Sequence, residues 1–105
     1  MKRMLVVAVV VICSAGLAYA AVQQAVSQKG RLFSPGALHV KAGETLLFKN
    51  DDSVTHHIYS STKGQEFDLE TTHPGQDVKH TFTTPGRVEV RCGLHPGMRL
   101  IVTVD

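Results

Sequence analysis

Residues 86–104 read GRVEVRCGLHPGMRLIVTV and contain two alternating segments joined by a short loop. In the first segment, Val88, Val90 and Cys92 alternate with charged residues. In the second, apolar residues recur at every other position from Met98 to Val104. Because successive side chains of a strand point to opposite faces of a sheet, both segments are predicted to be half-buried β-strands.

The loop between these segments carries three side chains that can bind a metal. Cys92, His95 and Met98 are spaced three residues apart and supply a thiolate, an imidazole and a thioether. A trigonal set of one sulfur and two ring nitrogens with a weak axial Met suits copper, both as Cu(I) and as Cu(II). The second nitrogen must come from elsewhere in the chain, and the adjacent pair His56 and His57 is the predicted donor.

Strand parity selects between these two histidines. Residues 54–59 alternate, so His56 shares the inward face with Val54 and Ile58, and His57 faces outward. Cys92 ends its own strand on the inward face. We therefore expect the thiolate and the His56 imidazole to meet beneath the loop, with His57 as the rival of His56.

The first twenty residues have the features of a secretory leader. Lys2 and Arg3 precede an apolar run that extends from Met4 to Ile12, and residues 18–20 form a small-x-small cleavage site. The prediction is a signal peptide over residues 1–20 and one domain over residues 21–105, in a periplasmic or otherwise exported protein. An uncleaved anchor is the alternative, because the apolar span is almost long enough to cross a bilayer.

Removal of the leader changes the cysteine and charge balance. It takes away Cys13, so the mature chain holds one cysteine and no internal disulfide is expected. A lone thiol in an oxidising compartment is a liability unless it is buried or holds a metal. Lys2 and Arg3 account for the formal net charge of +2. With no basic cluster and no ladder of aromatic residues, the mature sequence argues against binding to nucleic acid or a membrane surface.

The rest of residues 21–105 reads as short alternating segments between Gly and Pro turns. Such segments cover residues 38–40, 46–48 and 78–82, and no helical period is present. The chain is too short for crossover helices, so the predicted fold is all-β, an antiparallel β-sandwich. Residues 61–75 are predicted to form a loop around one side.

The remaining histidines have plainer interpretations. His80 lies on an inward position between Val78 and Phe82, and it is predicted to be a hydrogen-bonded structural residue. His39 and His73 are predicted to face solvent.

Two motifs resemble those of the cupredoxin family, small type 1 copper proteins of the plastocyanin and amicyanin kind. Phe48-Lys49-Asn50 followed by His56 resembles the upstream ligand strand of that family. The segment that contains Phe82, Gly86, Cys92, His95 and Met98 resembles the downstream ligand strand of the family. The short spacing between His95 and Met98 is closer to amicyanin than to plastocyanin.

This resemblance implies a Greek-key β-sandwich, one copper ion and one-electron transfer between exported redox proteins. It implies that His56, Cys92 and His95 are the equatorial ligands and that Met98 is the axial ligand. Where the family carries Asn after the upstream ligand, this chain has His57. The side-chain clasp that Asn gives to the Cys loop is therefore not expected, although the backbone N–H of residue 57 can still donate to the Cys92 sulfur.

Three classes of function compete for these residues. The first is a monomeric electron carrier that docks with redox partner proteins through the nearly uncharged residues around His95, which are Gly93, Leu94, Pro96 and Gly97. The second is a copper-binding or delivery module, with a tetrahedral zinc site as a variant. The third is an enzyme with Cys92 and His95 as a nucleophile pair. The chain offers no third orienting group, and Met98 fills the fourth position, so catalysis is not expected.

Overall fold

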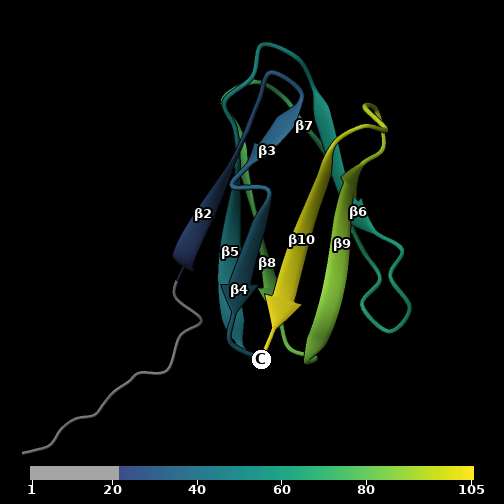
Figure 1. Cartoon of the computed structure of the whole chain (residues 1–105). Coiled ribbons are helices and arrows are strands. Elements are labelled where there is room, and N and C mark those ends of the chain that lie inside the picture. The colour runs from purple at the N-terminus through teal and green to yellow at the C-terminus, as the bar shows by residue number, and fades with distance from the viewer. Residues whose placement is uncertain (1–21) are drawn as a thin grey trace, which may run out of the picture.

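The computed structural model describes residues 22–105, which form two β-sheets packed face to face (Figure 1). One sheet has the strand order β4-β10-β9-β6-β7, and the other has the order β3-β2-β5-β8. The strands are β2 (Val22–Lys29), β3 (Leu32–Ser34), β4 (Ala37–Val40), β5 (Glu44–Asn50), β6 (His56–Ser60), β7 (Phe67–Thr72), β8 (Asp77–Phe82), β9 (Gly86–Cys92) and β10 (Arg99–Val104). The predicted β-sandwich is confirmed.

Both sheets are mixed rather than purely antiparallel. β10 pairs with β4 in parallel, and β2 pairs with β5 in parallel, whereas β9 is antiparallel to β10 and β6. Strands that follow one another along the chain, such as β3 and β4 or β4 and β5, often lie in different sheets. The chain therefore crosses repeatedly from one sheet to the other, and β6 and β9 lie side by side although residues 61–85 separate them in sequence.

The alternating segments of the sequence lie in strands, but one predicted loop is partly wrong. Residues 38–40 fall in β4, residues 46–48 in β5 and residues 78–82 in β8. Residues 67–72, within the predicted loop over residues 61–75, form β7 and pair with β6. β7 lies at the edge of its sheet and is interrupted by a register shift, and Phe67 and Leu69 are only partly buried. Its apolar pattern is therefore weak.

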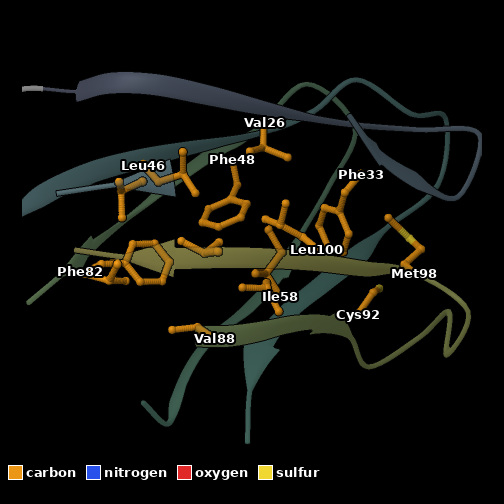
Figure 2. Close-up of a cluster of buried hydrophobic side chains, with 14 residues drawn as sticks. Val26, Phe33, Leu46, Phe48, Ile58, Phe82, Val88, Cys92, Met98 and Leu100 are labelled. Carbon is orange, nitrogen blue, oxygen red and sulfur yellow. The ribbon is translucent and has the colours of Figure 1, made fainter. Parts of the chain in front are cut away.

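The core lies between the sheets and consists of the inward side chains of both (Figure 2). Its fully buried members include Val26, Leu46, Phe48, Ile58, Val88, Val90, Leu100 and Val102. Burial of each such side chain stabilises the folded state by about 1.5–3 kcal/mol relative to leaving it exposed. Cys92 and Met98 belong to the same cluster and lie at one end of it, so the packing of the core also positions their sulfur atoms.

His80 is inward-facing, as parity predicts, and stacking holds its ring. The ring centroid lies 3.8 Å from that of Phe67 and 4.7 Å from that of Phe82. Burial lowers the pKa of the His80 imidazole, which favours the neutral ring in this apolar setting. Within residues 22–105 the contacts of that ring are aromatic, and its predicted hydrogen bond stays a prediction.

The predicted leader, residues 1–20, lies outside the described residues, so the leader and the domain boundary at residue 21 stay predictions. In the portion of the chain that the structure covers, we find no helix with the length and apolar character needed to cross a bilayer.

The loop before β6 is held by the buried side chain of Asn50, the last residue of β5. Its amide nitrogen donates to the carbonyl oxygens of Val54 and Thr72, both at 3.0 Å. Its amide oxygen accepts from the backbone N–H of Asp52 at 3.0 Å. One side chain therefore ties the end of β5, the loop over residues 51–55 and the end of β7 together.

Replacing Asn50 should weaken the fold measurably. The Asn50→Ala variant is expected to lose about 2–3 kcal/mol of unfolding free energy, because two backbone carbonyls and one N–H lose a partner in a buried setting. Urea denaturation of the full chain measures this loss. As a control, the exposed Thr83→Ala variant should stay within about 0.5 kcal/mol of the wild type. A loss for Asn50→Ala no larger than that of the control would show that the loop is held by other contacts.

Candidate metal centre

Three donor atoms from two remote strands and one loop converge at one end of the sandwich. His56 begins β6 and Cys92 ends β9, and these strands pair through Ile58 and Cys92. Nδ1 of His56 lies 3.6 Å from Sγ of Cys92, and Nδ1 of His95 lies 3.7 Å from the same sulfur. All three donor atoms lie within 4.8 Å of one another. His56 is 0% exposed and Cys92 is 1% exposed, so parity places both inward as predicted.

The loop between β9 and β10 positions His95 and Met98. The backbone N–H of Met98 donates to the carbonyl oxygen of His95 at 2.9 Å and closes a turn. Met98 shares the inward parity of Leu100, and its side chain is 1% exposed. Cys92 and Met98 lie at the same end of the core (Figure 2). The rings of His56 and His95 face each other at a tilt, with centroids 4.9 Å apart.

The spacing of these donors fits one metal ion. Bond lengths of about 2.0–2.3 Å to nitrogen and sulfur, at trigonal angles, put neighbouring donor atoms about 3.8 Å apart. The two distances from Sγ to Nδ1, 3.6 and 3.7 Å, are close to that value. A thiolate, two imidazoles and a nearby thioether are also the donor types that copper prefers. Both Sγ–Nδ1 distances and the donor types are therefore compatible with one copper ion, and Met98 lies at the same end of the core.

The electrostatics of His95 favour its ligating form. Loss of hydration lowers the pKa of the His95 imidazole, and the neighbouring His56 and Arg31 lower it further, while Asp52 opposes them. A metal ligand needs a neutral ring with a free nitrogen lone pair. His95 is also only partly buried, so one edge of its ring remains near the surface.

His57 faces away from the donor cluster, as its parity predicts, but still contacts the Cys92 loop. Its backbone N–H donates to Sγ of Cys92 at 3.3 Å, which confirms the predicted backbone contact. Its Nε2–H donates to Oδ1 of Asp68 at 2.8 Å. A Cβ atom on Gly93 would lie 2.5 Å from Nδ1 of His57, so the imidazole packs directly over Gly93. A side-chain contact from residue 57 to the Cys92 loop was not expected from the sequence. The structure shows one, because the His57 ring lies against Gly93 of that loop.

The sequence did not predict a role for Asp52, which contacts one of the four candidate ligands. Its Oδ2 lies 3.0 Å from Nε2 of His56, on the side of the ring away from Cys92. This hydrogen bond is the largest of the causes that lower the pKa of Asp52 to about 2. In the sequence, Asp52 is recognisable only as an acidic residue four positions before a candidate ligand. Because those positions lie in a loop, that spacing does not predict a contact. His39 and His73 are exposed and lie apart from the cluster, as predicted.

Comparison with known sequences identifies relatives of this chain. The family model described as a cupredoxin-like domain matches residues 2–104. Methylamine utilization protein MauL of Methylorubrum extorquens is 31% identical over 70 residues, which are 66% of this chain and 60% of that protein. Chloroplastic plastocyanin of Hordeum vulgare is 31% identical over 88 residues, covering 70% of this chain and 55% of that protein. The chain thus spans a little over half the length of these curated relatives.

Solved structures with the same fold include named copper proteins. A purple cupredoxin from Nitrosopumilus maritimus has a TM-score of 0.71 and 26% identity, and the match covers 79% of this chain and all of that one (100%). A mutant of amicyanin with Cu(I) has a TM-score of 0.72 and 25% identity, covering 85% and 86% of the two chains. The Cu-containing nitrite reductase from Thermus scotoductus matches over 91% of this chain but 25% of its own, with a TM-score of 0.75 and 26% identity. The family model, the sequence relatives, the fold and the donor cluster agree, and the chain belongs to the cupredoxin family.

Proposed function

We propose that this protein is an electron carrier that holds one copper ion through His56, Cys92, His95 and Met98. The observation that carries the proposal is the convergence of Sγ of Cys92 with the Nδ1 atoms of both histidines within 4.8 Å. Met98, buried at the same end of the core, would supply the fourth donor. A copper ion in such a site supplies a one-electron couple, because the same ligands accept both of its oxidation states.

The protein around the donors supports electron transfer rather than catalysis. His56, Cys92 and Met98 are buried, so a rigid core holds three of the four donors and little rearrangement accompanies a change of charge. With two imidazoles, a thiolate and the Met98 thioether around the ion, no coordination position is left open for a substrate. The protein is therefore proposed to carry electrons and not to be an enzyme.

The route of the electron is proposed to pass through His95. Its ring is partly exposed, and its Nδ1 lies 3.7 Å from Sγ of Cys92 on the inner side. Leu94 beside it is 51% exposed, one of the two large apolar side chains that project into solvent from the described part of the chain. A small apolar surface of this kind suits brief contact with another redox protein.

The place and partners of the protein follow from the same proposal. The leader-like residues 1–20 support export, to the periplasm or an equivalent compartment, with the mature chain acting as a monomer between an electron donor and an acceptor. A plastocyanin and an amicyanin among the relatives support this class of partner.

Spectroscopy and electrochemistry of the copper-loaded chain test the proposed function. We expect a strong visible absorption from thiolate-to-copper charge transfer, a paramagnetic resonance signal in the oxidised form and reversible one-electron voltammetry. Colourless Cu(I) that exchanges readily with a chelator would instead indicate copper delivery. Binding of zinc in preference to copper, with no visible band, would also contradict the carrier.

Truncating Leu94 should slow electron exchange and leave the copper site intact. For Leu94→Ala, we expect electron self-exchange between two copies to slow about fivefold, because an apolar contact at the centre of a small interface contributes about 1 kcal/mol. Line broadening in mixtures of oxidised and reduced protein measures the rate. The visible absorption and the potential serve as controls and should not change. An unaltered rate would contradict docking at this face.

A further inference from the structure

The imidazole of His56 is engaged at both of its nitrogens. Nδ1 lies 3.6 Å from Sγ of Cys92, whereas Nε2 lies 3.0 Å from Oδ2 of Asp52 on the opposite side of the ring. His56 is 0% exposed, and the side chain of Asp52 is 12% exposed. The carboxylate therefore contacts the ring in a largely dry environment, where a charge acts more strongly than at the surface.

Asp52 is itself held in place by three backbone contacts. Its Oδ1 accepts from the N–H of Ser53 at 2.9 Å, and its Oδ2 accepts from the N–H of Arg31 at 3.3 Å. Its own N–H donates to Oδ1 of Asn50 at 3.0 Å. The carboxylate is thus aimed at His56 by the β2–β3 turn and by the end of β5.

A carboxylate at Nε2 fixes the tautomer of His56. A carboxylate accepts hydrogen bonds, so the ring proton lies on Nε2 and donates to Asp52. Nδ1 then carries the lone pair that points at Cys92 and is free to ligate. Partners of this kind orient a metal-binding histidine and raise its strength as a donor.

We propose that Asp52 is a positioning residue that fixes His56 as a ligand and lowers the reduction potential of the copper site. This inference rests on the proposed function. A negative charge bonded to the far side of a ligand ring stabilises Cu(II) more than Cu(I), because the oxidised ion carries the larger positive charge. The site is thereby biased toward its oxidised form.

The next residue along β6 provides a matched control. His57 makes the same kind of contact, from Nε2 to Oδ1 of Asp68 at 2.8 Å, but its ring does not belong to the donor cluster. The side chain of Asp68 is 59% exposed, so solvent screens its charge. Asp52→Asn therefore removes one negative charge beside His56, and Asp68→Asn removes one beside His57.

The test compares reduction potentials of the copper-loaded full chain and these two variants. We expect Asp52→Asn to shift the oxidation equilibrium toward Cu(I) about tenfold, which is a rise of about 59 mV for a one-electron couple. The visible band should persist, since Asn can still accept the hydrogen bond. Asp68→Asn should keep the wild-type potential to within a small fraction of that shift.

A second measurement needs no copper. Long-range nitrogen–proton correlation spectra of the copper-free wild type should place the His56 proton on Nε2 alone, and Asp52→Ala should give a mixture of tautomers. A proton on Nδ1 in the wild type would overturn the inference.

The outcomes separate the two proposals. A wild-type chain that binds copper without thiolate absorption would overturn the proposed function and, with it, this inference. A coloured, reversible wild type together with equal potentials for Asp52→Asn and Asp68→Asn would overturn the role of Asp52 alone.

Discussion

The Cys92→Ser variant is expected to lose the visible absorption of the copper-loaded protein completely. That absorption requires a thiolate bonded to the metal, and a serine hydroxyl does not ionise near neutral pH and is a poor ligand for Cu(I). Serine is close to cysteine in shape, so the change removes the soft, ionisable sulfur and alters the packing little. The backbone N–H of His57, 3.3 Å from Sγ, can donate to the new hydroxyl oxygen.

Thermal unfolding provides the matching measurement on stability. A metal that binds only the folded chain stabilises it by about 4 kcal/mol when its concentration is 1,000 times the dissociation constant. For a domain of this size that corresponds to a rise in Tm of roughly 15–30 °C. We expect the wild type to show such a rise with copper and Cys92→Ser to lose most of it.

The copper-free proteins give the control for this experiment. Without copper, Cys92→Ser should unfold at a lower temperature than the wild type, because a hydroxyl replaces a sulfur in the buried core, so each copper-induced rise is measured from that protein's own copper-free Tm. A copper-loaded Cys92→Ser variant that keeps both its colour and its Tm shift would show that the sulfur is not a ligand.

Alternation in the sequence was sufficient to predict the sandwich and to place the inward residues of its central strands. Val88, Val90 and Cys92 lie on one face of β9 because side chains alternate, and burial of that face fixes the register of the strand. Alternation contains no information on which strands pair, however. The parallel pairs of β2 with β5 and β10 with β4 depend on how the whole chain crosses between the sheets.

β7 shows where local pattern fails. Its apolar residues Phe67 and Leu69 are only partly buried, and as the edge strand it has one neighbour, β6. Glu70 adopts a positive φ of 62°, and its N–H donates to the Asp68 carboxylate, so the strand is irregular. A segment stabilised by one neighbour and by side-chain contacts to the backbone carries little of the periodicity that identifies a strand.

The donor cluster was more predictable than its surroundings. Cys92, His95 and Met98 are close in sequence, and strand parity places His56 on the inward face of β6. Asp52 and Asp68 bond the outer nitrogens of His56 and His57, but both lie where no periodicity governs direction: one in a loop, the other beside a register shift. Their contacts follow from tertiary packing, which only the structure contains.

Separate replacement of the two adjacent histidines should divide their roles cleanly. We expect copper-loaded His56→Ala to lose the thiolate-to-copper band, because Nδ1 of His56, which is buried and 3.6 Å from Sγ, is one of the proposed donors. His57→Ala should keep the band. Its backbone N–H contact with Sγ does not depend on the side chain, and its ring is directed toward Asp68 and Gly93.

Visible absorption and paramagnetic resonance of the two variants, with equal copper loading, measure this difference. Loss of the imidazole over Gly93 should change the band of His57→Ala modestly, through looser packing of the Cys92 loop, whereas His56→Ala should have no band to shift.

Loss of colour in His57→Ala alone would mean that β6 presents its other face to the metal. Since a one-residue slip moves every side chain of a strand to the opposite face, Ile58 would then have to leave the core, where it is 0% exposed. The spectra of these two variants therefore test the register of β6 as well as the identity of the ligand.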